Sequence, residues 1–291
     1  MFCRVELGAF IRRHNIYEDR RIVAAFRMLR RGASRVGLHI VPKSFYSAIP
    51  DVATLPPGTF ERRSPLAGVR LDLDAQLAWA REHLAEPMRE FTPPEAPTYG
   101  PVDSIVLYGM LRALRPARVI ELGSGASTHV TAAALRANGE GELEVFDPYP
   151  GDGVDGIARL HRARAQDVPA ATFEALRSCD VLFVDTTHTV KIGSDVNHIV
   201  LDVLPRLAPG VVVHFHDIFL PYEYPRRWLE DFGLYWAEQY LLQAFLACNA
   251  DFEVLLAVTA LARDRSEAFA ELLPATVTRR AGAAFWLRRT S

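Results

Sequence analysis

From Arg118 to the end of the chain, short apolar runs alternate with stretches in which apolar residues recur every three or four positions. Near-continuous apolar runs separated by amphipathic helices are typical of a parallel sheet that is covered on both faces. The expected strands are RVIEL, LEVFD, a weak one near RARAQ, DVLFVD, GVVVHFHD, FEVLLAV and AAFWLRR. The expected helices span Ser127–Ala137, Pro169–Arg177, Ser194–Leu207 and Trp236–Cys248. The pattern predicts an α/β fold with helices on both faces of the sheet.

The first hundred residues follow a different pattern. Helical periodicity covers Tyr17–Leu29 and Leu71–Phe91, and the proline-rich segment TPPEAP precedes a further helix over Val102–Leu114. We therefore predict a helical N-terminal extension over residues 1–98 and a main domain over residues 99–291.

Composition limits the class of partner. Of 291 residues, 49% are hydrophobic, and 33 Lys and Arg face 35 Asp and Glu, for a net charge of −2. This balance argues against nucleic acid as a partner, because phosphate binding needs a concentrated basic surplus. Three scattered cysteines favour a reduced, cytoplasmic protein, and no apolar run approaches the roughly 18 residues of a membrane span. We expect no membrane partner.

One local charge anomaly stands out. The stretch Ile11–Arg35 is rich in arginine and has helical periodicity. It is either a helix that binds a membrane surface or an anionic ligand, or an amphipathic helix with a solvated basic face.

The segment VIELGSGASTHV, Val119–Val130, reads as a strand, a glycine turn and a helix. Gly123 and Gly125 let the backbone turn tightly near a ligand, and Ser127 is placed to cap the helix. Glu121 precedes the turn, and the third glycine of the dinucleotide fingerprint is missing. A carboxylate there repels a pyrophosphate but holds an ammonium group, which favours a nucleoside that carries an amino acid over NAD.

Two further acidic stations follow along the chain. Asp147 ends LEVFD about twenty residues after the glycines, where an acid binds ribose hydroxyls, although FDPYP also reads as a plain turn. Gln166 and Asp167 lie where an adenine amino group would need an acceptor, while Asp167 also reads as a helix cap.

These stations in this order resemble the class I S-adenosylmethionine-dependent methyltransferases, and most closely a bacterial group of mostly unassigned substrate. The resemblance runs from FYSAIPD through ELGSGAST and VLFVDTTHTVKIGSDVN to HDIFLPYEYP, EQYLLQAFLACN and FWLRR. It implies a Rossmann-like sheet of seven strands with a reversed last strand. It also implies that the cofactor is S-adenosyl-L-methionine and that its contacts are Glu121, Gly123, Ser124, Gly125, Ser127, Asp147, Gln166, Asp167 and Asp185.

The methyltransferase resemblance also gives a reason for polar residues at the ends of two buried strands. Metal-dependent O-methyltransferases place an acid after the fourth strand and a polar pair after the fifth, which map here onto Asp185 and onto His216 and Asp217. This set would suit a divalent metal: carboxylates alone favour Mg²⁺, and the imidazole moves the preference toward Mn²⁺, Fe²⁺ or Zn²⁺. The alternative is metal-free, with His216 or His188 as general base oriented by Asp217 or Asp185.

Other residues of this region carry weaker expectations. His214 lies deeper in its strand and is expected in the core, and Ser194 or Asp195 is expected to cap a helix. The aromatic run after the fifth strand either walls an apolar acceptor pocket or packs the loop onto the sheet. Its members are Phe215, Phe219, Tyr222, Tyr224, Trp228 and Tyr235.

The favoured function is therefore O-methylation of a small molecule, in secondary-metabolite or polysaccharide tailoring. A nicotinamide-dependent oxidoreductase on a similar sheet is the alternative enzyme, and a scaffold that keeps the fold without turnover is the alternative of another class. We expect the N-terminal extension either to cap the active site or to build a homodimer interface.

Overall fold

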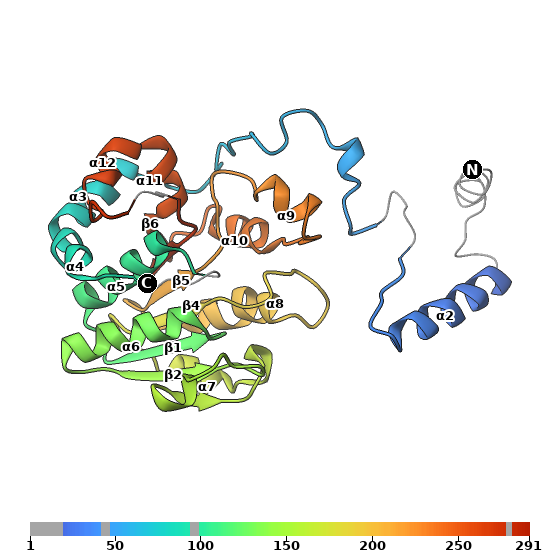
Figure 1. The fold of residues 1–291 in the computed structure, drawn as a ribbon, viewed down its shortest axis with the longest axis horizontal. Helices are drawn as coiled ribbons and strands as arrows, with labels where there is room; N and C mark the ends of the chain where they lie inside the picture. Colours follow the sequence, from blue (N-terminus) through green and yellow to red (C-terminus); the bar gives the residue numbers. More distant parts are fainter. Residues whose placement is uncertain (1–19, 42–46, 94–98, 278–280) are drawn as a thin grey trace. The chain divides into compact units, whose positions relative to one another are not determined.

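The computed structural model of the chain describes residues 20–41, 47–93, 99–277 and 281–291 (Figure 1). The chain divides into two compact units, Met1–Pro57 and Gly58–Ser291. The first unit contains helix α2 (Arg20–Ser34) and the short 3₁₀ turn η1 (Val52–Thr54). Helix α2 overlaps the predicted helix Tyr17–Leu29, whose first three residues lie outside the described residues, as do Phe45 and Tyr46 of FYSAIPD.

The division between the units falls about forty residues before the boundary predicted at residue 98. Helices α3 (Leu73–His83) and α4 (Ala85–Glu90) belong to the second unit, where Gln76 of α3 bonds the backbone of Val254 and Ala257. The functional division into extension and main domain stays a prediction, and so does the homodimer.

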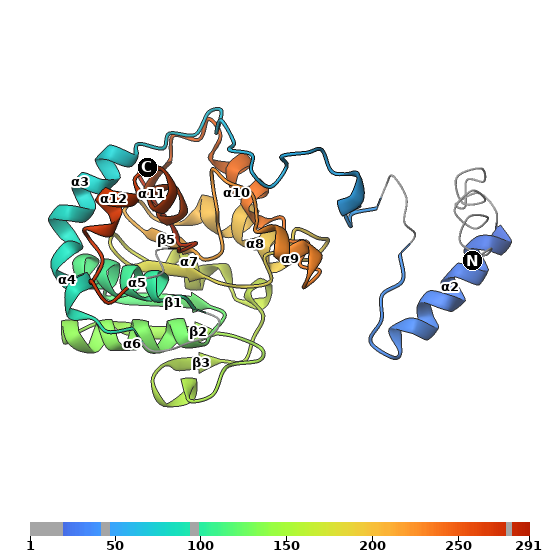
Figure 2. The same cartoon turned by 45° about the horizontal axis from the view of Figure 1, so that its top comes forward.

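The second unit contains a seven-stranded sheet in the order β3-β2-β1-β4-β5-β7-β6. Strands β1 to β5 run parallel, and β7 runs antiparallel to both of its neighbours, which confirms the reversed last strand. Helices lie on both faces, with α5 and α6 side by side along the sheet in both views (Figures 1 and 2). The strands are β1 (Arg118–Leu122), β2 (Glu142–Phe146), β3 (Arg159–His161), β4 (Val181–Val184), β5 (Val212–Phe215), β6 (Phe252–Ala257) and β7 (Phe285–Arg289).

Four helices of the second unit fall close to the predicted ranges, and a short helix over Arg226–Glu230 was not predicted. The helices after α4 are α5 (Pro101–Leu114), α6 (Ala126–Asn138), α7 (Ala170–Glu174), α8 (Asp195–His198), α9 (Arg226–Glu230), α10 (Glu238–Leu246), α11 (Val258–Asp264) and α12 (Ser266–Ala270). Short 3₁₀ turns are η2 (Val154–Gly156) and η3 (Ala165–Asp167). Among the described residues, no helix combines the length and the apolar character that crossing a bilayer requires.

Two predicted helices are interrupted, and prolines explain both. The predicted helix Leu71–Phe91 breaks at Leu84 between α3 and α4, because Pro87 has no N–H to donate to the carbonyl of residue 83. The predicted helix Ser194–Leu207 continues from α8 through a π-helical segment, η4 (Ile199–Val203), and closes in a 3₁₀ turn, η5 (Leu204–Arg206), around Pro205.

The third strand lies directly before the segment near which it was predicted. The expected strand near RARAQ is a loop followed by η3, and the paired residues are the three just before it. The register explains this, since Arg159–His161 lie opposite Glu144–Phe146, and the carbonyl of His161 accepts the N–H of Asp147 at 3.0 Å. Pairing with β2 therefore ends before the Arg-Ala alternation begins.

The core positions the ends of the central strands. Strands β4 and β5 are buried along their whole length, and β1 is buried from Val119 onward. Because these three strands are parallel neighbours, their carboxyl ends meet at one edge of the sheet, where ligands of open α/β sheets bind.

Candidate active site

The glycine turn after β1 is shaped by its neighbour β4. Gly123 has a φ of +89°, and a Cβ on it would stand 1.9 Å from the carbonyl oxygen of Asp185. Its N–H donates to the carbonyl of Phe146 at 3.0 Å. Gly123 thus lets the ends of β1 and β4 close on each other, whereas a Cβ on Gly125 would meet open space.

Glu121 is fully buried beneath this turn. Its Oε1 accepts hydrogen bonds from the hydroxyls of Ser127 at 2.6 Å and Thr128 at 3.0 Å, and its Oε2 has no partner among the described residues. Burial raises the pKa of Glu121 to about 8, against the two hydroxyl bonds that lower it. The unpartnered oxygen is what an ammonium group would satisfy.

The expected cap of the following helix is corrected. Ser127 lies inside α6 and donates to Glu121, so its hydroxyl is not a cap. Thr128 takes the capping role instead, because its hydroxyl oxygen accepts the N–H of Gly125 at 3.0 Å. Thr128 is the third residue of α6, and a side chain at this position can bend back to the backbone N–H of the residue that precedes the helix.

The structure brings Asp147 and Ser124 together. The Ser124 hydroxyl donates to Asp147 Oδ2 at 2.7 Å, and the N–H of Tyr149 donates to Oδ1 at 2.7 Å. Gly151 closes the loop by donating its N–H to Ser124 Oγ at 3.2 Å. Asp147, at the end of β2, therefore lies beside the glycine turn, as the sequence predicts. It also forms a turn within FDPYP, which was the alternative interpretation of this residue.

Gln166 and Asp167 lie in η3 and have partners of their own. Both carboxylate oxygens of Asp167 bind Arg164, at 2.7 and 3.0 Å, and the Gln166 amide donates to the carbonyl of Gly193 at 3.3 Å. Pro169 stands at the N-cap of α7 without a side-chain hydrogen bond, so Asp167 does not cap that helix.

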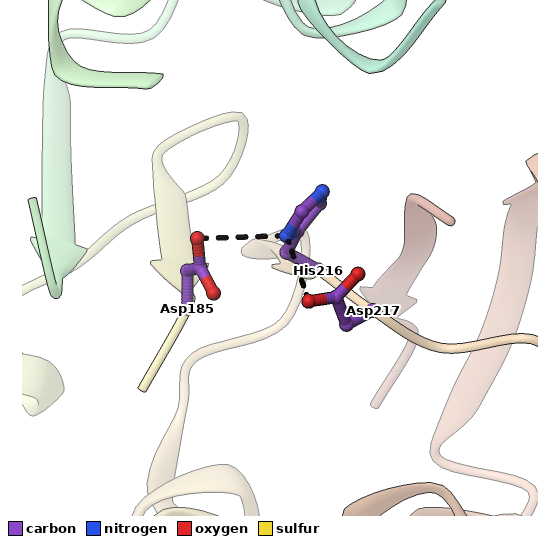
Figure 3. A group of neighbouring side chains, drawn as sticks. All are labelled: Asp185, His216 and Asp217. Carbon is purple, nitrogen blue, oxygen red and sulfur yellow. Dashed lines mark ion pairs between the residues drawn. The ribbon is translucent and has the colours of Figure 1, made fainter. Parts of the chain in front are cut away.

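Asp185, His216 and Asp217, the carboxylate–histidine trio, meet at the ends of β4 and β5 (Figure 3). His216 Nδ1 lies 3.5 Å from Asp185 Oδ2 and 3.5 Å from Asp217 Oδ2. This nitrogen is buried, and neither contact has hydrogen-bond geometry. One ligand atom from each residue lies within 4.8 Å of the others. Donors bound to one ion at about 2.1 Å stand roughly 3 to 4 Å apart, so the trio fits a divalent cation.

His188 reaches the same place from the loop after β4. Its Nε2 lies 3.1 Å from Asp185 Oδ1 and 3.9 Å from Asp217 Oδ2. Its Nδ1 lies 2.8 Å from Oε2 of the fully buried Glu238 on α10, and its carbonyl accepts the N–H of Glu238. The ring is thereby fixed between two carboxylates from different elements.

His216 has a comparable partner on its far side. Its Nε2 lies 3.6 Å from Asp103 Oδ2 on α5. Asp103 Oδ1 accepts the N–H groups of Ala283 and Ala284, at 2.9 and 3.0 Å, just before β7. Asp103 therefore links the histidine to two elements that frame the end of the sheet.

The electrostatics of this cluster are dominated by carboxylates. Burial alone would lower the pKa of both histidines, but the hydrogen bonds that His188 donates to Asp185 and Glu238 raise its pKa to about 10. The charges of Asp185 and Asp217 likewise raise the pKa of His216 well above its usual value. For Asp185, burial is outweighed by the two histidines, which hold its pKa well below the ordinary range. The cluster contains more carboxylates than imidazoles and therefore attracts cations; its carboxylates are Asp103, Asp185, Asp217 and Glu238.

Two backbone features hold the cluster in place. His188 and Asp217 both adopt left-handed conformations, with φ of +53° and +57°, which non-glycine residues rarely do. Asp195 anchors the loop of His188 by accepting the N–H and hydroxyl of Thr187, at 3.0 and 2.7 Å. Ser194 caps α8 through the N–H of Asn197, which confirms one of the two predicted caps.

The aromatic residues after β5 pack largely on one another. The Phe219 ring meets Trp228 edge-on at 5.2 Å, and Trp228 meets Trp236 at 4.9 Å. Trp236 in turn covers His188, with ring centroids 4.2 Å apart. The aromatic cluster thus borders the site, and Phe215 is fully buried within β5. His214 is in the core as predicted, 4.4 Å from the rings of both Phe183 and Trp286.

Sequence reasoning missed Asp103, Glu238 and Trp236 as members of the site. Asp103 reads as an ordinary acid in the first turn of a helix, yet it lies on a face that is otherwise apolar, with Val106 and Met110. Glu238 stands at the start of the quoted EQYLLQ segment and gives no sign of burial. The only available signal for either was a charge on an apolar helix face.

Comparison with known proteins gives a match for the central part of this unit. Residues 120–218 match the family model of a methyltransferase domain. The matched segment covers about a third of the chain. It runs from β1 to the end of the trio and so contains the glycine turn, Asp147 and Asp185. Among curated proteins, none matches the chain.

Solved structures of low sequence identity resemble the chain in part. One is the SAH-bound methyltransferase PaMTH1 of Podospora anserina, with 16% identity over 77% of this chain and 91% of that chain, at a TM-score of 0.42. Another is the O-methyltransferase TomG of Streptomyces achromogenes, involved in tomaymycin synthesis and bound to SAM, with 19% identity over 77% of this chain and 92% of that chain, at a TM-score of 0.42. Neither likeness bears on the substrate of this chain.

Proposed function

We propose that the chain is an S-adenosylmethionine-dependent methyltransferase that methylates an oxygen of a small molecule, with a divalent metal held by the carboxylate–histidine trio. The observation that carries the proposal is a convergence at one edge of the sheet. There the unpartnered, buried oxygen of Glu121 at the end of β1 accompanies the trio at the ends of β4 and β5.

Glu121 and Asp147 fit the amino-acid and ribose parts of such a cofactor. Glu121 Oε2 is the acceptor for the ammonium group, and the turn at Gly123 keeps the backbone clear of side chains. Asp147 lies beside this turn, with Ser124 as its present partner. Adenine recognition by Gln166 and Asp167 requires the pair of Asp167 with Arg164 to open. The sulfonium supplies an activated methyl group, so the chain's task is alignment of the acceptor.

The contacts of His188 make it a poor general base. A base must accept a proton near neutral pH, but His188 lies against carboxylates at both ring nitrogens and its pKa is raised to about 10. The charges of Asp185 and Asp217 also raise the pKa of His216, and a cation bound among these carboxylates would take the place of its ring proton. When bound, a divalent cation would polarise an acceptor hydroxyl and lower its pKa. The side chains that would hold it are Asp185, His216 and Asp217.

The acceptor would enter beside the aromatic cluster that borders His188. Trp236 and Trp228 supply an apolar wall next to the carboxylates. A metal-assisted site suits acceptors with two adjacent oxygens, such as a catechol-like metabolite or a sugar diol, and these would be screened first.

Binding of the cofactor product tests the first half of the proposal. Titration calorimetry with S-adenosylhomocysteine should give saturable binding that Glu121→Gln weakens, while NAD and NADH give none. The control is Glu144→Gln, an acid on β2 that pairs with Arg118 on the sheet surface. Binding of NADH with no binding of S-adenosylhomocysteine would favour the oxidoreductase instead.

Elemental analysis tests the second half. Protein purified without chelator should contain near-stoichiometric Mn, Fe or Zn, and His216→Ala and Asp185→Asn should lose it. The control is His198→Ala, because His198 pairs with Asp202 outside the trio. If methyl transfer survives chelator and no metal is found in the parent protein, the general base replaces the metal, and single hydroxyls or carboxyls become the acceptors to screen.

A further inference from the structure

Helix α2 of the first unit is amphipathic, with most of its arginines on one side and a set of apolar side chains on the other. The segment Arg20–Arg35 contains six arginines and no acid, although the whole chain is slightly acidic. At 100° per residue, Arg20, Arg27 and Arg31 share one face of the helix, and the opposite face carries Phe26, Leu29 and Ala33. Ile22 lies on the same apolar face, whereas Val23 and Met28 lie among the arginines.

Taken by itself, the first unit leaves no described residue of α2 fully buried. On the apolar face Leu29 is 52% exposed, and Ile22, Phe26 and Ala33 are half-buried. The segment after the helix continues this exposure, with Val36 at 73% and Leu38 at 60%. An amphipathic helix in a globular core would bury this face instead.

The basic side forms a hollow of about 390 Å³ near the end of the helix. Its lining combines guanidinium groups with apolar side chains: Arg27, Arg30, Arg31, Ser34, His39, Ile40 and Val41. Within the described residues, Arg27, Arg30 and Arg31 form no ion pair with an acid. Three guanidinium groups lie beside the apolar side chains of Ile40 and Val41 in this hollow. Such a lining matches a lipid, whose phosphate headgroup continues into an acyl chain.

We propose that α2 docks on an anionic phospholipid surface, with its arginines on the headgroups and its apolar face at the acyl boundary. Helices of this composition lie in the plane of the bilayer interface. A second copy of the chain is a poorer occupant, because the arginine-rich faces repel each other. Nucleic acid would leave the apolar face exposed.

This proposal departs from the expectation of no membrane partner. That expectation rested on the chain-wide charge and on the lack of a spanning segment, and neither describes a local surface helix. The proposal concerns the first unit alone, and it stands independently of the reaction carried out by the methyltransferase domain.

The test is co-sedimentation of the full chain with vesicles. Phosphatidylcholine vesicles with about 30 mol% phosphatidylserine should bind the protein, pure phosphatidylcholine should not, and added salt should weaken binding. Arg27→Gln, Arg30→Gln and Arg31→Gln together should lower the partition coefficient on the order of a hundredfold. The matched control replaces three exposed arginines of the second unit, Arg136, Arg159 and Arg162, by glutamine.

A second variant tests the apolar face. Phe26→Ser with Leu29→Ser should also reduce binding, unlike the same change at the exposed Ile192 and Leu201. Equal binding to neutral and anionic vesicles, or equal loss in the arginine variant and its control, would overturn the proposal. A dimer in lipid-free solution that the variant of the apolar face dissociates would assign the helix to a second copy instead. Affinity for S-adenosylhomocysteine, measured on the same samples, should stay unchanged throughout.

Discussion

The Nδ1 atom of His188 lies 2.8 Å from Oε2 of Glu238, and both side chains are buried. The contact joins the loop after β4 to the start of α10, and it directs Nε2 of the histidine toward Asp185. A carboxylate that holds the far nitrogen of a histidine fixes its tautomer and orientation. Glu238 is therefore a positioning residue: it orients His188, and His188 in turn contacts Asp185 of the trio.

Glu238→Gln should weaken metal binding without removing a ligand. The amide cannot accept the ring N–H with the same strength, so Asp185 loses a fixed neighbour, and we expect affinity for Mn²⁺ or Zn²⁺ to fall roughly 10- to 100-fold. Competition with a chromophoric chelator measures this directly. Glu223→Gln is the control, since Glu223 bonds Tyr240 and Gln239 away from the trio. Unchanged metal affinity in Glu238→Gln, with lowered stability alone, would reduce Glu238 to a structural role.

Gly123→Ala should destabilise the protein by at least about 3 kcal/mol. The new Cβ would meet the carbonyl oxygen of Asp185 at 1.9 Å, and alanine is strained at a φ of +89°. Urea unfolding measures the loss. Gly156→Ala is the control, because a Cβ there has nothing within 4 Å and the backbone is not left-handed. A cost at Gly123 no larger than at Gly156 would mean that the ends of β1 and β4 separate easily.

The periodicity of the sequence predicts most of the sheet because the strands are buried on both faces. The strand RVIEL is found as β1 without change, and β4 and β5 differ from their predicted ranges by residues at the ends. The strand near RARAQ was placed only approximately, because β3 is a short edge strand whose position depends on its pairing with Glu144–Phe146. Local sequence carries little information on such a register.

The site was predictable only where a strand ends in a polar residue. Asp185, His216 and Asp217 follow buried strands of known order, so their meeting follows from the topology. Asp103 and Glu238 reach the histidines from α5 and α10, and which helix covers the end of a sheet is decided by tertiary packing. The repositioned cap at Thr128 has the same origin, since buried Glu121 draws the Ser127 hydroxyl inward.

His214→Leu should stabilise the protein by about 1 kcal/mol. Both ring nitrogens of His214 are buried without a hydrogen-bond partner, between the rings of Phe183 and Trp286. An apolar side chain of similar size removes the cost of these two unsatisfied polar atoms. Urea unfolding should show a higher midpoint with an unchanged slope. His129→Leu, at an exposed position on α6, should shift the free energy of unfolding by less than about 0.5 kcal/mol. A destabilised His214→Leu would indicate that the imidazole has a packing role that leucine cannot supply.

Glu121 should make the stability of the cofactor-free protein depend on pH. Burial raises its folded pKa to about 8 from the ordinary 4.5 of a glutamate, so between these values the folded state holds a proton that the unfolded state has lost. Stability should then fall as pH rises from about 5 to 8, by at most about 1.4 kcal/mol per pH unit. Glu121→Gln removes this contribution, and its stability advantage over the parent should grow across the same window. Parallel pH profiles for the two proteins would contradict the raised pKa.

The same proton links Glu121 to the cofactor. If the ammonium group of S-adenosylhomocysteine meets Glu121, binding at pH 7 ionises the carboxyl and releases up to one proton, and affinity rises with pH toward 8. Calorimetry in two buffers of different ionisation enthalpy measures the release. Glu121→Gln should bind more weakly and release almost no proton, whereas Glu144→Gln should match the parent. Equal proton release from parent and Glu121→Gln would place the ammonium group elsewhere and leave the unpartnered oxygen of Glu121 as a feature of the core.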